Sequence, residues 1–307
     1  MAIDHDQIFK TLVKNFFQEF MELFLPKEAA IIDFSKVEFL EQESFTDIVG
    51  GARKEMDLVA RVGLKTGGEE YILVHDEFQA KRAPDFSKRM FEYFCLLYLR
   101  YQKTIIPIAV FTDDAQWMKP VPDTFDIRLN DRTYVHFEYH LIKLKHFDYR
   151  QFLESENPLA FALMAKMNYK RSQRVRLKAD FLRWILGAPI NPARQSLLLD
   201  FVETYIALNR AEETEFEQII EHKPEYKEVE KMVTTYEKRG IQKGRKEGRT
   251  KGRKEALQHS LILLIEKRFG SPDEQIKEQV GRIRSVKKLE SLMVQILDAE
   301  SIDELGL

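Results

Sequence analysis

Two carboxylic acids, Asp57 and Glu77, lie on short apolar segments that flank the glycine pair Gly67-Gly68. Residues 56–62 and 71–77 both have the composition of β-strands, and the glycine pair between them predicts a hairpin turn. In a hairpin folded at this point, residues whose numbers sum to about 134 face each other across the ladder. The spacing therefore predicts that Asp57 faces Glu77.

Two carboxylates at one place repel each other unless a cation lies between them. A hard divalent ion such as magnesium would relieve the repulsion and lower the pKa of its own bound water. Side chains two residues apart on a strand share a face, so Gln79 and Lys81 lie on the side of Glu77. The group predicts a metal-dependent hydrolytic site. Charged residues at the end of a strand also suit simple exposure to solvent, so the spacing alone leaves both interpretations open.

The elements around this hairpin predict an α/β core. A capping-box pattern, Asp4 with Gln7, precedes an apolar stripe at helical spacing that predicts a helix ending near Leu25, before Pro26. Asp6 lies at the start of this helix, where it either joins the site or serves as a plain N-terminal acid. Three further elements are predicted: an edge strand at 37–40, a helix at about 85–102 and a doubly buried strand at 105–111.

The segment from Thr133 to Leu144 alternates polar and apolar residues and predicts one further strand. His136, Glu138 and His140 would share one face of it. Such an array could hold zinc, but the solvated face of an edge strand explains the same pattern.

From Pro158 onward the periodicity predicts helices. Residues 170–178 include five basic residues that either contact phosphates or form a solvated helix face. Residues 238–254 are strongly basic and contain glycine at every fourth position, namely Gly240, Gly244, Gly248 and Gly252. Because each glycine costs a helix ~1 kcal/mol against alanine, this segment is either a linker or a helix that needs a partner. It could engage the backbone of a nucleic acid.

The chain is expected to divide into a domain at 1–150, a helical extension at 151–236, the basic linker at 237–254 and a small helical domain at 255–307. The net charge of -2 over 307 residues does not indicate nucleic-acid binding by itself. Cys95 is the single cysteine, which excludes an intramolecular disulfide and favours a reducing compartment. No apolar run reaches the ~18–20 residues of a membrane helix, and the first residues do not look like a signal peptide, so we expect a cytoplasmic protein.

These residues resemble the recombination-promoting nuclease family, whose members are also described as transposase-like, within the PD-(D/E)XK nuclease superfamily. The resemblance covers roughly the first 150 residues. It is carried by His5-Asp6, by Asp57 at the start of a strand and by the next strand with Glu77 and Gln79. It continues in the helix with Arg89-Met90-Phe91-Glu92-Tyr93 and in the strand Ile105-Ile106-Pro107-Ile108-Ala109-Val110. The segment from about Gly252 is similar to an uncharacterised helical domain that often follows this nuclease domain.

The resemblance implies a restriction-endonuclease-like core, a mixed central sheet flanked by helices, followed by an all-helical C-terminal region. It also implies that Asp57 and Glu77 hold the catalytic Mg²⁺, which Mn²⁺ could replace, and that Asp6 completes the metal site. A lysine usually stands where this chain has Gln79. An amide can orient a water but cannot offset developing charge, so Lys81 or Arg89 would have to supply that charge.

The expected function is metal-dependent cleavage of DNA in recombination, with Asp57, Glu77, Gln79 and Lys81 as the catalytic residues. The alternative is a weak or inactive module of the same fold that binds nucleic acid or a protein partner. In that alternative, the helical C-terminal domain would drive self-association. A homo-oligomer is expected.

Overall fold

The computed structural model describes residues 5–40, 58–66, 72–79, 85–115, 117, 121–297, 299 and 301–306. For residues 5–6, 72–79, 235–250, 253 and 303 it describes the backbone alone. The chain divides into two compact units, Met1–Glu230 and Lys231–Leu307. The finer boundaries expected at residues 150, 236 and 254 stay predictions.

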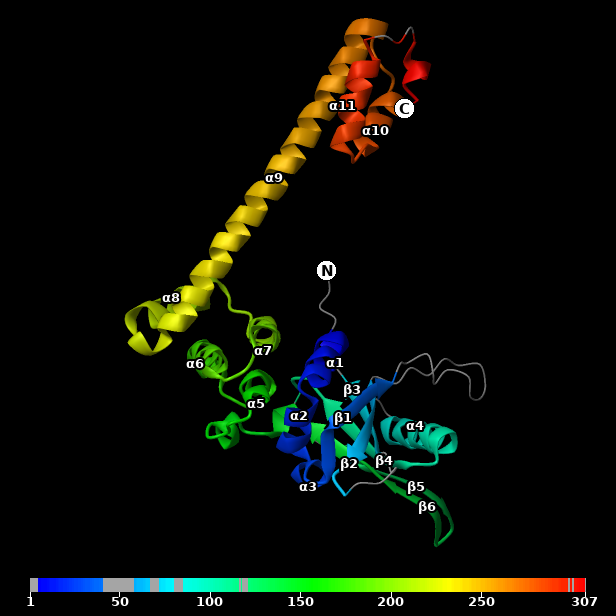
Figure 1. The fold of residues 1–307 in the computed structure, drawn as a ribbon, viewed down its shortest axis with the longest axis vertical. Helices are drawn as coiled ribbons and strands as arrows, with labels where there is room; N and C mark the ends of the chain where they lie inside the picture. The colour runs from blue at the N-terminus through cyan, green and yellow to red at the C-terminus, as the bar shows by residue number, and fades with distance from the viewer. Residues whose placement is uncertain are drawn as a thin grey trace. The chain divides into compact units, whose positions relative to one another are not determined.

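The first unit is built on a five-stranded mixed sheet with the order β1-β2-β3-β4-β7 (Figure 1). The first three strands are antiparallel neighbours, whereas β4 runs parallel to β3 and β7 runs parallel to β4. Their bounds are Ile32–Leu40, Leu58–Leu64, Ile72–Gln79, Thr104–Phe111 and His140–Lys143. The expected α/β class and the order of helix, three strands, helix and strand are therefore confirmed.

The register of the β2–β3 hairpin agrees with the sequence prediction. Leu58 pairs with Asp76 and Val62 with Ile72, so both pairs sum to 134. A period-2 pattern sets the register wherever one face of a strand is buried. In β2, the consecutive residues Leu58, Val59 and Ala60 are buried as well as Val62, so the pairing was predictable from the position of the glycine pair rather than from alternation.

Helices cover both faces of the sheet (Figure 1). The N-terminal helices α1 (His5–Asn15), α2 (Phe17–Phe24) and α3 (Pro26–Ala29) lie on one side, where Phe17 packs edge-on against Phe34 and Phe39 of β1. The prediction of one continuous helix to Leu25 is wrong. Phe16 interrupts it with non-helical φ and ψ of -127° and 38°, while its ring is fully buried beneath the guanidinium of Arg194.

On the opposite side of the sheet, α4 (Phe86–Tyr101) presents Phe86, Met90, Tyr93 and Leu97 to the core. This spacing is that of an amphipathic helix. The helix ends at Gln102, which has the left-handed φ of 52° that often terminates helices. Bounds and buried face both agree closely with the sequence prediction. The apolar run before Thr112 forms β4, in which all residues after Thr104 are buried.

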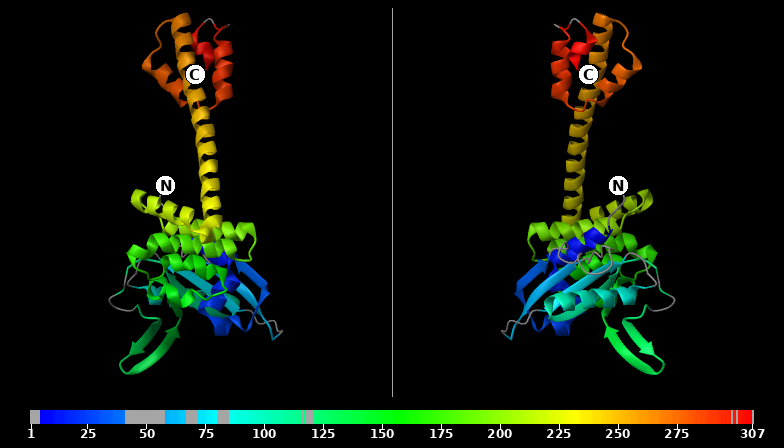
Figure 2. Two further views of the ribbon diagram at one scale, coloured as in Figure 1. Left: turned by 90° about the vertical axis from the view of Figure 1, so that its left-hand side faces the viewer. Right: turned by 90° about the vertical axis from the view of Figure 1, so that its right-hand side faces the viewer.

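The prediction of a single strand from Thr133 to Leu144 is wrong. Strands β5 (Thr124–Leu129) and β6 (Arg132–Glu138) form a separate two-stranded sheet that projects from the body of the unit (Figure 2), and β7 begins afterwards at His140. Tyr139 lies between the two strands: its hydroxyl donates to the carbonyl of Pro122 at 2.5 Å and its amide donates to the carbonyl of Asp123. This buried residue holds the chain where it passes between the two sheets.

The helical region that follows packs beside α1 and α2 through α5 and α7, in agreement with the periodicity after Pro158. Its helices are α5 (Pro158–Leu163), α6 (Arg174–Gly187), α7 (Pro192–Tyr205) and α8 (Arg210–His222). Phe9 of α1 meets Phe201 and Tyr205 of α7, which joins this region to the sheet domain. Two short 3-10 turns lie between α5 and α6.

The glycine-rich basic segment is helical. It lies inside α9 (Lys227–Phe269), which is continuous across residues 238–254. The C-terminal unit then packs the end of α9 with α10 (Glu274–Arg282) and α11 (Val286–Gln295). Its apolar core is that of a helical domain, as expected, and consists of Leu261, Ile265, Val280, Leu289, Leu292, Ile296, Ala299 and Leu305. None of the helices described is long and apolar enough to cross a membrane.

Candidate functional site

Of the predicted site residues, Glu77 and Gln79 have described positions, where a strand of the main sheet ends. Glu77 and Gln79 occupy the carboxyl end of β3, where Glu77 pairs with Ala109 and Gln79 with Phe111 of β4. Asp6 belongs to α1, a helix that contacts β3. Asp57 and Lys81 lie outside the described residues.

The helix α4 covers the face on which the partners of Glu77 and Gln79 lie. Ala109 and Phe111 are buried in one apolar cluster with Phe86 and Met90 of α4. Residues paired in a parallel ladder share a face of the sheet, so the register places the positions of Glu77 and Gln79 on the α4 face. Arg89 belongs to the first turn of that helix, with its guanidinium 5.1 Å from the ring centre of Phe86 and its Nε and Nη2 atoms buried.

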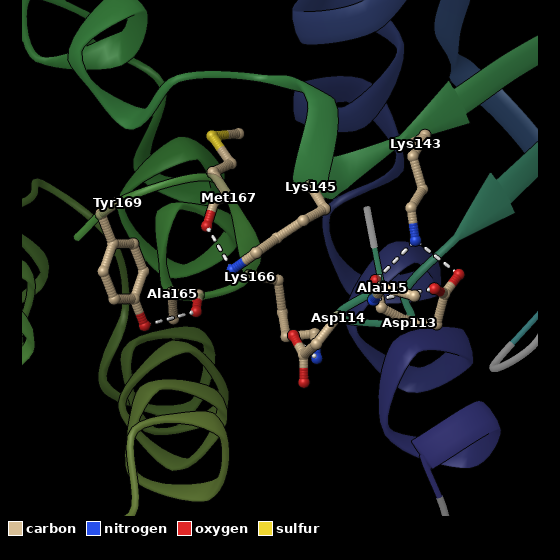
Figure 3. Close-up of polar contacts among 9 residues, drawn as sticks. All are labelled: Asp113, Asp114, Ala115, Lys143, Lys145, Ala165, Lys166, Met167 and Tyr169. Carbon is tan, nitrogen blue, oxygen red and sulfur yellow. Dashed lines mark hydrogen bonds and ion pairs between the residues drawn. The ribbon is translucent and has the colours of Figure 1, made fainter. Parts of the chain in front are cut away.

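A cluster of lysines and aspartates lies at the carboxyl ends of the neighbouring strands β4 and β7 (Figure 3). We call Asp113, Asp114, Lys143, Lys145 and Lys166 the lysine–aspartate cluster. The aspartates follow β4 directly, Lys143 ends β7, and Lys166 comes from the 3-10 turn Met164–Lys166. Phe111 pairs with both Gln79 and Lys143, so these two positions are roughly 10 Å apart, two strand spacings.

Lys143 and Asp113 form a buried ion pair. The Lys143 Nζ atom donates to the backbone carbonyl of Asp113 at 2.5 Å and forms an ion pair with its Oδ2 atom, also at 2.5 Å, and the lysine side chain is only 1% exposed. Its ammonium also lies 4.7 Å from the ring centre of Trp117. Burial lowers the pKa of Lys143, and the hydrogen bond to Asp113 opposes that shift. The pair fixes the loop after β4 against the end of β7.

The other two lysines of the cluster are held more loosely. Lys166 donates to Asp114 Oδ1 at 2.8 Å, but the carboxylate of Asp114 is 73% exposed. Lys145 donates to the carbonyl of Met167 at 3.3 Å and lies 5.3 Å from the ring centre of Tyr169. Burial lowers the pKa of Lys145 as well. Within the lysine–aspartate cluster, three lysines therefore share two carboxylates. The cluster carries a formal excess of one positive charge.

A cluster of this kind can bind an anion. Ligands of α/β proteins commonly bind beyond the carboxyl ends of the strands, where backbone and side chains converge. The sequence reasoning missed these residues because Lys143 lay within, and Lys145 just after, an apparently ordinary alternating strand. The acids Asp113-Asp114 directly after a buried strand were the one signal that could have pointed to them.

The zinc interpretation of the His-x-Glu-x-His array is not supported. His136 Nδ1 lies 2.6 Å from Asp126 and its Nε2 3.0 Å from Glu138, whereas His140 lies in the other sheet, 3.5 Å from Glu28. Across the described ranges, no group of three or more histidine, cysteine, aspartate or glutamate side chains could hold a metal ion. Asp57 and the side chain of Glu77 lie outside the described parts of the chain.

The basic stretch at 170–178 divides into two kinds of residue. Arg174 donates to the carbonyl of Ala207 and Lys178 to Glu203, so these two join helices. Lys170, Arg171 and Arg176 are exposed, and Arg176 lies 3.9 Å from the carboxylate of Asp180.

One comparison with known proteins identifies a relationship. The profile of a family described as "Putative transposase, YhgA-like" matches residues 3–185, more than half of the chain. The matched region includes the five-stranded sheet, the lysine–aspartate cluster and α6 up to Ile185. No curated protein and no solved structure gives a match.

Proposed function

Because the chain belongs to the YhgA-like family described as "Putative transposase", we propose that it is a metal-dependent DNA endonuclease that hydrolyses phosphodiester bonds during recombination. The observation that carries the proposal is the register of the β2–β3 hairpin. If this register continued one residue beyond the pair Leu58–Asp76, it would bring Asp57 opposite Glu77. The order of helix, three antiparallel strands, helix and parallel strand supports a restriction-endonuclease-like core around this pair.

The donor set suits a hard divalent cation. Asp57 and Glu77 offer the carboxylate oxygens that Mg²⁺ prefers, and Mn²⁺ could take its place. Asp6 is proposed as a further ligand, but it would have to reach the ion past the end of β3, because α1 lies on the side of the sheet opposite to α4. When bound, the ion would lower the pKa of a water and polarise the scissile phosphate.

The remaining residues would position the reactants. Gln79 would orient the attacking water through its amide, at the position where the superfamily usually has a lysine. Lys81 would supply the positive charge that the amide lacks. Arg89 is the other candidate for this role, since its helix covers the face on which the positions of Glu77 and Gln79 lie. The lysine–aspartate cluster would attract the DNA backbone beside the scissile phosphate.

The test is a plasmid-nicking assay with Mg²⁺. We expect Asp57→Ala and Glu77→Ala each to abolish cleavage, because either change removes a ligand of the ion. Glu38→Ala is the matched control: Glu38 is an exposed strand carboxylate on β1, and its loss should leave cleavage unchanged. Cleavage at the wild-type rate by either site variant would refute the proposal.

A second function is favoured by Gln79. If the amide cannot replace the usual lysine, the chain would bind nucleic acid or a protein partner without cutting. A folded wild-type protein that binds DNA but does not nick it in Mg²⁺ or Mn²⁺ would support this function. Insensitivity of binding to salt would instead indicate an assembly role without nucleic acid.

A further inference from the structure

A small polar cavity adjoins the lysine–aspartate cluster. Its volume is about 260 Å³, and its walls come from the loops after β7 and before α6. The lining residues are Asp148, Tyr149, Arg150, Asn168, Tyr169, Lys170 and Gln173. Because typical small-molecule pockets occupy ~300–1,000 Å³, this cavity has room for a single small planar group with its substituents.

Backbone hydrogen bonds hold the two loops together. The amide of Asn168 donates to the carbonyl of Phe147 at 2.8 Å, and the amide of Tyr149 donates to that of Asn168 at 3.4 Å. Asp148 and Asn168 form an isolated parallel β-bridge at the same place. The walls are therefore fixed in the absence of a ligand, which lowers the entropic cost of binding one.

The aromatic walls suit the face and the edge of a base. The rings of Tyr149 and Tyr169 lie 6.4 Å apart at 87°, so a flat group stacked on one ring meets the other with its edge. Tyr169 is fixed by its hydroxyl bond to the carbonyl of Ala165, and the ammonium of Lys145 lies near its ring. Tyr149 is thus the better surface for stacking. Amides of Asn168 and Gln173 provide hydrogen-bonding groups for the base edge.

The charge at the cavity suits a phosphate. Asp148 is neutralised by Arg150, which donates to it at 2.9 and 2.5 Å and, as the main cause, lowers its pKa to about 2. Lys170 and the neighbouring Arg171 are exposed, and neither forms an ion pair with a residue in the part of the chain that the structure describes. A larger neighbouring cavity shares Tyr149 and Gln173, but its three cations are balanced by Asp180, Glu215 and Glu225.

We propose that this small cavity binds one nucleotide of a single DNA strand, with the base stacked on Tyr149 and the phosphate beside Lys170. This assignment rests on the proposed function, because the bound DNA strand would belong to the DNA that the proposed endonuclease holds at the carboxyl ends of its β-strands. Lys145 connects the two places: it belongs to the lysine–aspartate cluster and contacts Tyr169 of the cavity. The base must leave a duplex to stack in this way, so the ligand is single-stranded.

The test measures binding of a fluorescent oligothymidylate to the full chain in EDTA, where no metal-dependent cleavage occurs. We expect Tyr149→Ala to weaken binding about tenfold and Tyr149→Phe to bind like wild type, because base stacking needs only the ring. Lys170→Ala should reduce the slope of log K against log salt by about 0.7, the value for one phosphate contact on a single strand.

Lys27→Ala is the matched control. Lys27 is an exposed lysine on α3. The next residue, Glu28, contacts His140 at the amino end of β7, whereas the cavity lies beyond the carboxyl end of β7, so Lys27 is not expected to reach the cavity. Its loss should leave affinity and salt slope unchanged. Because Tyr149 also packs on Phe181, a variant that fails to fold is replaced by Asn168→Leu, which should block the cavity and weaken binding by a similar factor.

Three results would overturn the assignment. These are wild-type affinity in folded Tyr149→Ala or Asn168→Leu, an unchanged salt slope in Lys170→Ala, and competition by thymidine monophosphate as strong as that by the oligonucleotide. The last result would indicate a free-nucleotide site. If oligonucleotide binding depends on Tyr149 while nicking is independent of Glu77, only the proposed function fails. The opposite combination rejects the cavity assignment alone.

Discussion

The buried pair of Lys143 and Asp113 should make a large contribution to the stability of the first unit. Asp113→Asn removes the carboxylate while Lys143 keeps its bond to the backbone carbonyl and its contact with Trp117. Removing one partner of a buried ion pair costs about 3–5 kcal/mol, because the other charge stays buried without compensation. The two retained contacts favour the lower end of that range. We therefore expect the free energy of unfolding to fall by about 3 kcal/mol.

Urea unfolding followed by tryptophan fluorescence measures this effect, since both tryptophans, Trp117 and Trp184, lie in the first unit. Glu38→Gln is the control. The side chains of Glu38 and its ionic partner Arg61 are 65% and 37% exposed, so their ion pair should contribute only about 0–1 kcal/mol to the free energy of unfolding. The double variant Asp113→Leu with Lys143→Met should recover much of the loss, since it leaves no buried charge.

The deficit should also depend on pH. Burial lowers the pKa of Lys143, and the loss of Asp113 should lower it further. Deprotonation then removes the uncompensated charge from the folded state, so the deficit of Asp113→Asn should narrow as pH rises toward the ordinary lysine value of ~10.4. A loss no larger than that of Glu38→Gln at neutral pH would refute the reasoning.

Three further outcomes are expected. Gly252→Ala should stabilise α9 by up to ~1 kcal/mol, because a Cβ atom at this position meets no other atom within 4 Å. The stabilisation should appear as slower hydrogen exchange of the helix amides, and faster exchange would contradict the prediction. The hydrogen bond to Asp126 is the main cause of the raised pKa of His136, so this pKa should fall toward ~6.5 in Asp126→Asn, as measured by NMR titration. In the wild type, the stabilisation from this bond should be lost as pH rises through the raised pKa. Gln79→Lys should raise the nicking rate about tenfold, and Lys81→Ala should lower it, if charge beside the water limits the reaction; unchanged rates would exclude that role.

The apolar pattern predicted those elements whose burial follows a simple period. The β2–β3 register followed from the position of the glycine pair between two apolar runs, and α4 from one apolar stripe. The pattern failed where a single residue redirects the chain. Phe16 interrupts the first helix and Tyr139 separates β6 from β7, yet both look like ordinary members of an apolar series.

Contacts between distant residues were not predictable from spacing. Lys143 is separated by 30 positions from Asp113, and Lys166 by 52 positions from Asp114, so their pairing depends on the parallel order of β4 and β7 and on the turn after α5. Glycine propensity left the state of residues 238–254 open between a linker and a helix, and they form part of α9. The site residues Asp57, Glu77, Gln79, Lys81 and Asp6 stay predictions.

The central claim is that Asp57 and Glu77 share one divalent cation. Titration of the full chain with Mn²⁺, with free Mn²⁺ measured by electron paramagnetic resonance, tests it without requiring catalysis. We expect one strong site in the wild type, an affinity at least tenfold weaker in Asp57→Ala and in Glu77→Ala, and wild-type affinity in Glu38→Ala. Equal Mn²⁺ affinity in the wild type and both site variants would contradict the claim.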